Sequence, residues 1–113
     1  MKLLSLASVA GAAAIIVLST LGARADDSGL ASMHDLRRER GRLCMVDHFH
    51  YGSSAGQPSK KAAVSEAVSS WQSFTDLEYG SDWARFRRAA SKEIKCKVSG
   101  SGWGCEVSAR PCR

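Results

Sequence analysis

The sequence predicts a small α+β fold, a two-layer sandwich in which helices cover a three-stranded antiparallel sheet stapled by two disulfides. Three observations lead to this prediction. Residues 99–102, Ser-Gly-Ser-Gly, are a turn signal between two segments that alternate apolar and polar side chains. An amphipathic helical pattern begins at Lys60, and the chain of 113 residues contains four cysteines. The expected order of elements is strand, helix, helix, strand, strand.

Residues 1–25 have the pattern of a secretory signal peptide. A lysine precedes a mostly apolar run over residues 3–21, and the small residues Ala23 and Ala25 frame a cleavage site. A retained membrane anchor is the alternative, because the run approaches the roughly 20 residues that span a bilayer. Serine, threonine and glycine dilute the run, so we expect cleavage after Ala25, no retained membrane span, and a periplasmic or secreted protein.

Residues 26–41 are predicted to be either a flexible basic leader or a short basic helix. Leu30, Met33 and Leu36 follow helical spacing, which favours a helix that ends at Gly41. Terminal segments without a packed face stay mobile, which favours the leader. Both alternatives remain open from the sequence.

Residues 42–113 are expected to form a single disulfide-stabilised domain. Alternation over residues 42–51 predicts its first strand, and the glycine, serine and proline of residues 52–58 predict a loop. Ser59 then provides the N-cap of a helix. This helix has an apolar face and ends at Gly80, and its face consists of Val64, Ala67, Val68, Trp71 and Phe74.

A second helical segment is expected after Gly80, capped by Ser81 or Asp82. Its apolar stripe would be Trp83, Phe86 and Ala90. The large aromatic residues of both helices and the hairpin are interpreted mainly as core. The alternative is that Trp83 or Tyr79 is exposed to bind a sugar or a protein.

The turn position and the alternation of apolar and polar residues predict the register of the final hairpin, residues 92–113. Folding the chain about the turn places Ile94 opposite Val107 and Cys96 opposite Cys105, and gives one apolar and one polar face. The cysteines then occupy a non-hydrogen-bonded pair, where Cα atoms approach to about 4.5 Å and a disulfide can close.

The second disulfide follows by elimination, because pairing Cys96 with Cys105 leaves Cys44 for Cys112. Export favours oxidised cysteines. A metal site of four thiolates is the rival interpretation, but the cysteine spacings contain no C-x-x-C pair.

The sequence resembles a group of small exported proteins of alphaproteobacteria over about residues 48–113. The resemblance depends on W-x-x-F from Trp71, E-Y-G-x-x-W from Glu78, W-x-C from Trp103 and A-R-P-C from Ala109. These proteins carry no assigned activity. The resemblance therefore implies an envelope protein with this helix and hairpin, and it transfers no catalytic residue.

His48 and His50 are the candidate metal ligands. Residues two apart on a strand face the same way, so both imidazoles could bind one Zn²⁺ or Cu²⁺, with Asp47, His34 or Tyr51 completing the shell. The simpler interpretation is two partly exposed histidines at a strand end. His34 is expected to be a solvated residue.

No catalytic motif is found, so an enzyme is not expected and no cofactor is predicted. The chain lacks G-x-S-x-G and phosphate-loop patterns. Its net charge of +5 is compatible with an envelope protein or an anionic polysaccharide as partner, more than with nucleic acid. We expect a non-catalytic binding or structural module of the cell envelope. The alternatives are a metal-binding protein that uses His48 and His50, or a small secreted hydrolase or hydrolase inhibitor.

Overall fold

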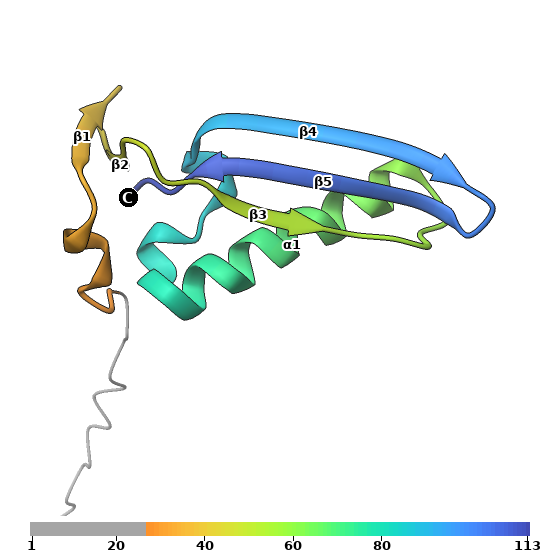
Figure 1. Cartoon of the computed structure of the whole chain (residues 1–113), viewed down its shortest axis with the longest axis horizontal. Helices are drawn as coiled ribbons and strands as arrows, with labels where there is room; N and C mark the ends of the chain where they lie inside the picture. The colour runs from red at the N-terminus through yellow and green to blue at the C-terminus, as the bar shows by residue number, and fades with distance from the viewer. Residues whose placement is uncertain (1–26) are drawn as a thin grey trace, which may run out of the picture.

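The computed structural model describes residues 27–113 and shows an α+β protein with one α-helix and two antiparallel sheets (Figure 1). The expected signal peptide and its cleavage site lie outside the described residues. The elements are η1 (Leu30–Met33), β1 (Leu36–Glu39), β2 (Arg42–Met45), β3 (His50–Ser53), α1 (Lys60–Tyr79), η2 (Ser81–Trp83), η3 (Phe86–Arg88), β4 (Ala90–Ser99) and β5 (Gly102–Arg110).

The hairpin of β4 and β5 has the register that the sequence predicts. Ile94 pairs with Val107 and Cys96 with Cys105, and the Cα atoms of the two cysteines lie 4.1 Å apart in a disulfide. β3 pairs with the other side of β5, which makes a three-stranded antiparallel sheet in the order β3, β5, β4. A three-stranded antiparallel sheet is thus present, although it is not the only sheet of the described residues.

Helix α1 packs across β3 and β5, as Figure 1 shows. The hydroxyl of Ser59 caps the helix by accepting a hydrogen bond from the amide of Ala62 at 3.1 Å, and Gly80 ends it with a φ of 96°. Trp71 is fully buried between helix and sheet, and its indole donates to the carbonyl of His50 at 2.9 Å. The helix is thereby anchored to the first residue of β3.

The expected strand over residues 42–51 is wrong as a single element, because the chain changes partners within it. β2 pairs with β1, and the amide of Met45 also donates to the carbonyl of Pro111. Only from His50 does the chain join β5. A smaller two-stranded sheet thus precedes the main sheet.

The segment before β2 is a strand instead of the short helix or flexible leader considered from the sequence. β1 returns into β2 through Arg40 and Gly41, whose φ angles are 49° and 78°. Two successive residues with positive φ are typical of a type I′ hairpin turn. Residues Leu30–Met33 form only a 3₁₀ turn.

The predicted second helix is also wrong, because two 3₁₀ turns, η2 and η3, take its place. Trp83 and Phe86 anchor this segment by burial, and the amide of Phe86 donates to the side-chain carbonyl of Gln72 at 3.3 Å. Trp83 and Tyr79 are both buried, so the alternative in which either is exposed is wrong.

The apolar hairpin face is covered only in part. α1 lies over β3 and β5, and the edge strand β4 leaves Ile94 and Val98 exposed. Phe74, expected in the core, is half exposed. The core instead depends on Trp71, Phe86 and Val107 with several small alanines.

The second disulfide joins Cys44 to Cys112, as expected, and both cysteines are fully buried. It links β2 to the residues that follow β5. The two disulfides fit an extracytoplasmic protein. Among residues 27–113, no helix has the length and apolar character needed to cross a membrane.

Candidate metal centre

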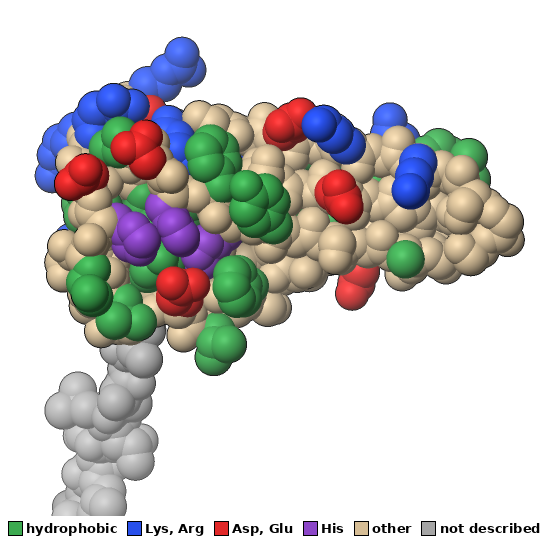
Figure 2. Space-filling model, viewed as in Figure 1, with side chains coloured by type: hydrophobic (Ala, Val, Ile, Leu, Met, Phe, Trp, Pro, Cys, Tyr) green, Lys and Arg blue, Asp and Glu red, His purple; other side chains and the backbone are tan. Residues whose placement is uncertain are grey.

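Segments far apart in the sequence bring three histidines and one glutamate together. His34 follows η1, His48 lies between β2 and β3, His50 begins β3, and Glu78 belongs to the last turn of α1. Figure 2 shows the histidines as one purple patch near the N-terminal hairpin. Ligand atoms of His34, His48 and Glu78 all lie within 4.8 Å of one another. This trio has the donor atoms of a metal site.

Tyr79 is the buried centre around which the histidines gather. Its ring lies 5.5 Å from that of His34, 5.9 Å from that of His48 and 5.0 Å from that of His50, measured between ring centroids. The rings of His34 and His48 are 4.3 Å apart. Because Tyr79 precedes the helix-ending Gly80, the end of α1 places both the tyrosine and Glu78 at this point.

The hydroxyl of Tyr79 is hydrogen-bonded to His34, with Tyr79 Oη 2.7 Å from His34 Nε2. Burial, with the neighbouring Glu78 adding to the effect, raises the pKa of Tyr79 above its ordinary value of 10.0. Tyr79 is therefore a neutral phenol at physiological pH. Its contact engages Nε2 of His34 and leaves Nδ1 outside this hydrogen bond.

Thr75 sets the tautomer of His50. The Thr75 hydroxyl donates to the carbonyl of Trp71 at 2.7 Å, so it can only accept from His50 Nδ1 at 2.9 Å. Nε2 of a neutral His50 then carries a lone pair. That nitrogen is buried, and it finds no partner with hydrogen-bond geometry among the described residues.

The lone pair of His50 faces a carboxylate oxygen. Nε2 lies 3.2 Å from Oε2 of Glu78, close enough for an ionic contact, although the angles do not meet the geometry of a hydrogen bond. Nε2 of His48 is likewise buried without a hydrogen-bond partner in the described part of the chain. Unpaired buried polar atoms are costly, and a cation would satisfy a nitrogen that carries a lone pair.

Electrostatics keep these imidazoles in the form that binds metals. Burial lowers the pKa of His50 below its ordinary value of 6.5, although Glu78 acts in the opposite direction. Burial also lowers the pKa of His48, and the neighbouring His34 adds to this effect. Neutral imidazole is the metal-binding form, so a cation need not displace a proton from either ring at neutral pH.

A route to solvent leads past acidic side chains. His34 and His48 line a polar hollow of about 290 Å³ together with Met33, Asp35 and Asp47. Carboxylates beside a partly buried site raise the local concentration of cations. Figure 2 shows acidic side chains close to the histidine patch.

The structure changes the set of candidate ligands. His48 lies in the cluster, and His50 contacts Glu78, but His50 is only 2% exposed instead of partly exposed. His34, expected to be solvated, joins the cluster. Asp47 lines the hollow, whereas Tyr51 is exposed on the strand residue after His50 and contributes no ligand to the trio.

Glu78 is the residue that the sequence did not reveal. It follows Trp71 by seven residues and Thr75 by three, so all three lie on the same side of α1. A carboxylate in line with a buried tryptophan and threonine is a polar interruption of a core face. This polar residue on an otherwise buried helix face is the sequence feature that could have pointed to Glu78. A single glutamate near a helix end is otherwise common.

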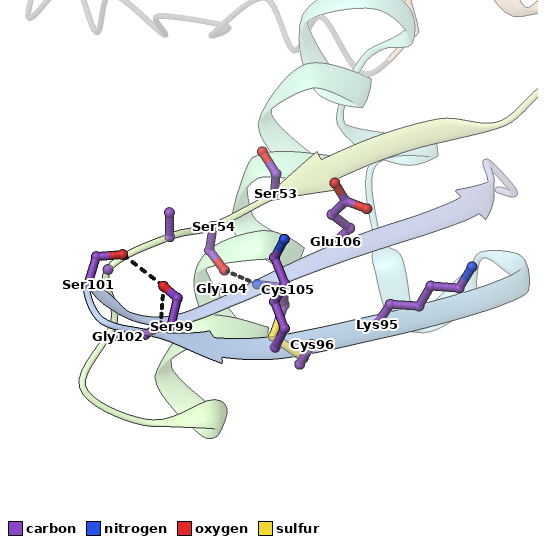
Figure 3. A pocket seen from close by; sticks show the side chains of 13 residues that line it. Ser53, Ser54, Lys95, Cys96, Ser99, Ser101, Gly102, Gly104, Cys105 and Glu106 are labelled. Atoms are coloured by element: carbon purple, nitrogen blue, oxygen red, sulfur yellow. Dashed lines mark hydrogen bonds between the residues drawn. A yellow bond between two sulfur atoms is a disulfide. The ribbon is translucent and has the colours of Figure 1, made fainter.

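A second hollow of about 290 Å³ lies at the far end of the hairpin (Figure 3). Three of its four serine hydroxyls have partners: Ser54 accepts from the amide of Cys105 at 3.0 Å and donates to the carbonyl of Ala63, and Ser99 contacts Ser101 at 3.0 Å. The histidine cluster, with its unpaired buried nitrogens, is therefore the stronger candidate site.

Comparison of the chain with protein-family models, with curated proteins and with solved structures finds no significant match. The geometry of the histidine cluster is therefore the basis for the function proposed below.

Proposed function

We propose that this protein is an exported, non-catalytic module of the cell envelope that binds a divalent transition metal, Zn²⁺ or Cu²⁺. The convergence of His34, His48 and Glu78 carries the proposal, because their ligand atoms lie within 4.8 Å of one another. Imidazole nitrogen and carboxylate oxygen are ligands that both metals accept.

Groups outside the trio support metal binding over a purely structural polar cluster. Metal-ligating histidines usually donate their second N–H to an oxygen, which fixes the tautomer. The Tyr79 hydroxyl oxygen lies 2.7 Å from Nε2 of His34 and can serve in this way, and beside the trio the Thr75 hydroxyl accepts from His50. A polar cluster with only a structural role would pair its inner nitrogens, yet Nε2 of His48 and of His50 lack hydrogen-bond partners within residues 27–113.

Isothermal titration of the processed protein with ZnCl₂ and with CuSO₄ tests the proposal. We expect one equivalent of at least one metal to bind with submicromolar affinity. Glu78→Gln should weaken binding at least tenfold, since it replaces an anionic ligand by a neutral one. Glu66→Gln is the matched control, because Glu66 is an exposed glutamate on the same helix.

His34→Ala provides a second test from a different segment of the chain. It should weaken binding by a similar factor, while the far-ultraviolet circular dichroism stays that of the unsubstituted protein. Absence of stoichiometric binding, or equal affinity in the Glu78→Gln and Glu66→Gln variants, would overturn the proposal.

A further inference from the structure

Strand β4 forms one edge of the main sheet. The strand order is β3, β5, β4, so β5 pairs with only one side of β4 (Figure 1). Within residues 27–113, no other strand pairs with its outer side. An edge strand such as Ala90–Ser99 has unpaired backbone donors and acceptors, which another strand can use.

The pairing with β5 determines which residues of β4 direct their backbone groups outward. The Cα atoms of Cys96 and Cys105 are 4.1 Å apart, which is typical of an antiparallel pair that exchanges no backbone hydrogen bonds. The two kinds of pair alternate along a ladder, so Ile94 and Val98 occupy sites of the same kind. The amide and carbonyl groups of these residues therefore point away from β5, towards the free edge.

The side chains along this edge are exposed and alternate between the two faces of the sheet. Ile94 and Val98 lie on the same face as the buried Val107, but they are 46% and 62% exposed. Glu93 and Lys95 lie on the other face, where Lys95 Nζ is 3.1 Å from Glu93 Oε1. The edge thus presents an apolar residue between two opposite charges.

This order of residues is complementary to itself in a two-fold antiparallel pair. With the axis at Ile94, that residue faces its own copy, and Glu93 faces Lys95 of the second copy on each side of the axis. Because Ile94 directs its backbone groups outward, the two copies of Ile94 can exchange both backbone hydrogen bonds. Opposite charges directly across two strands attract each other.

Charge disfavours the neighbouring registers. An axis at Lys95 places that lysine opposite its own copy, and an axis at Cys96 places Lys95 opposite Lys97 twice. An axis at Glu93 places two glutamates opposite each other. Like charges directly opposite destabilise a sheet, and lysines on an edge strand commonly prevent such pairing. Of these four registers, only the one centred on Ile94 avoids every opposition of like charges.

We infer that a second copy of this chain pairs with β4 in a two-fold antiparallel dimer centred on Ile94. The two main sheets then form one continuous sheet, in the order β3, β5, β4, β4, β5, β3. Contact between the two copies of Ile94 removes exposed apolar surface from water. The register shift between Ala90 and Glu93 interrupts the strand and keeps the paired segment short, so the dimer is reversible.

Charge reversal tests this register. Sedimentation equilibrium of the processed protein in buffer with EDTA measures dimerisation without metal-bridged association. Glu93→Lys alone and Lys95→Glu alone each place like charges opposite each other twice, and each should raise the dimer dissociation constant about tenfold. The double variant, which exchanges the two charges, restores the attraction and should dimerise like the unsubstituted protein. Glu66→Lys, the same reversal at an exposed residue of α1, is the matched control and should have no effect.

Hydrogen exchange of the unsubstituted protein tests the edge pairing itself. The amide of Lys95 is bonded to β5 and should exchange slowly at every protein concentration. The amide of Ile94 faces the free edge, so it should exchange quickly in the monomer and about tenfold or more slowly in the dimer. Fast exchange of the Ile94 amide in dimeric protein would show that another surface is used.

The outcomes are separate from those of the metal titrations, because no residue of the interface belongs to the histidine cluster. A protein that stays monomeric at high micromolar concentration would overturn the dimer. A dimer whose dissociation constant is the same in both single variants and in Glu66→Lys would overturn the interface. Failure of the double variant to recover dimerisation, while its circular dichroism is unchanged, would overturn the register.

Discussion

The guanidinium of Arg110 holds the carboxylate of Glu39 through two hydrogen bonds, from Nη1 to Oε2 at 2.6 Å and from Nη2 to Oε1 at 2.7 Å. Arg110 ends β5 and Glu39 ends β1, so this pair connects the two sheets. Nη1 also donates to the carbonyl of Met45 at 2.6 Å. The arginine side chain is 8% exposed, and Glu39 neutralises a largely buried charge.

We expect Glu39→Gln to lower the free energy of unfolding by about 1–3 kcal/mol, because it leaves the buried Arg110 charge uncompensated. Glu93→Gln, in an exposed pair with Lys95, should change it by less than about 1 kcal/mol. Urea denaturation at neutral pH measures both values. A loss no larger in Glu39→Gln than in Glu93→Gln would contradict the assigned role of the pair.

Lowering the pH should reduce the free energy of unfolding of the unsubstituted protein, because Glu39 becomes protonated and loses its ion pair with Arg110. Hydrogen bonding from Arg110 lowers the pKa of Glu39 from 4.5 to about 2. A carboxyl with a depressed pKa stabilises the fold above its unfolded pKa, and this stability is lost as the pH falls from about 4.5 towards 2. Glu39→Gln should show a shallower decrease in stability over this range, measured by urea denaturation at several pH values.

Gly52 is expected to tolerate no side chain. A Cβ at this position of β3 would lie 2.2 Å from the carbonyl oxygen of Ala67 and 2.5 Å from the amide nitrogen of Trp71. Gly52→Ala should therefore push α1 off the sheet and cost about 3 kcal/mol or more. Gly100→Ala, where nothing lies within 4 Å, is the control and should leave the melting temperature almost unchanged. Similar melting temperatures in both variants would refute the close packing.

The long disulfide should contribute more stability than the short one. The sequence separations are 68 for Cys44 with Cys112 and 9 for Cys96 with Cys105. Loop-closure entropy predicts contributions of about 4.4 and 2.7 kcal/mol. Paired alanine substitutions and urea denaturation test this order. A larger loss from removing the short bridge would show that entropy of the unfolded chain does not dominate.

Tyr79→Phe should impair metal binding without removing a ligand. The substitution keeps the buried ring but loses the hydroxyl that is hydrogen-bonded to His34. We expect Zn²⁺ affinity to fall about 10- to 100-fold, as is common for groups that orient metal ligands. Tyr51→Phe, at an exposed tyrosine, should have no effect in the same titration. Unchanged affinity in Tyr79→Phe would contradict the orienting role.

Local patterns explain which elements the sequence predicts correctly. The register of β4 with β5 follows from a short turn and from alternation, because a slip of one residue would invert both faces. Ser59 and Gly80 mark the ends of α1 by capping chemistry within a few residues of each terminus. These signals need no knowledge of distant partners.

Long-range pairing explains the elements that were predicted wrongly. β1 is a strand because it pairs with β2, and β2 also bonds to residues 111 and 113 near the far end of the sequence. Likewise, His34 meets Glu78 only when α1 and the N-terminal hairpin are both in place. Spacing within one segment cannot reveal such a cluster, so the sequence singled out His48 and His50, offered His34 as one of three possible additional ligands, and missed Glu78.

The nested arrangement of the disulfides has a consequence for oxidative folding. Along the chain the cysteines occur in the order Cys44, Cys96, Cys105, Cys112, and the short bridge lies inside the loop that the long bridge closes. If the polypeptide crosses a membrane from its N-terminus, Cys96 is the first thiol that Cys44 can meet. If cysteines paired in the order in which they cross the membrane, Cys44 would form a non-native bond with Cys96. The native bond to Cys112 then requires either delayed oxidation or thiol–disulfide exchange. Efficient maturation should therefore depend on a disulfide isomerase, and trapping of a Cys44–Cys96 species in cells that lack one would reveal this dependence.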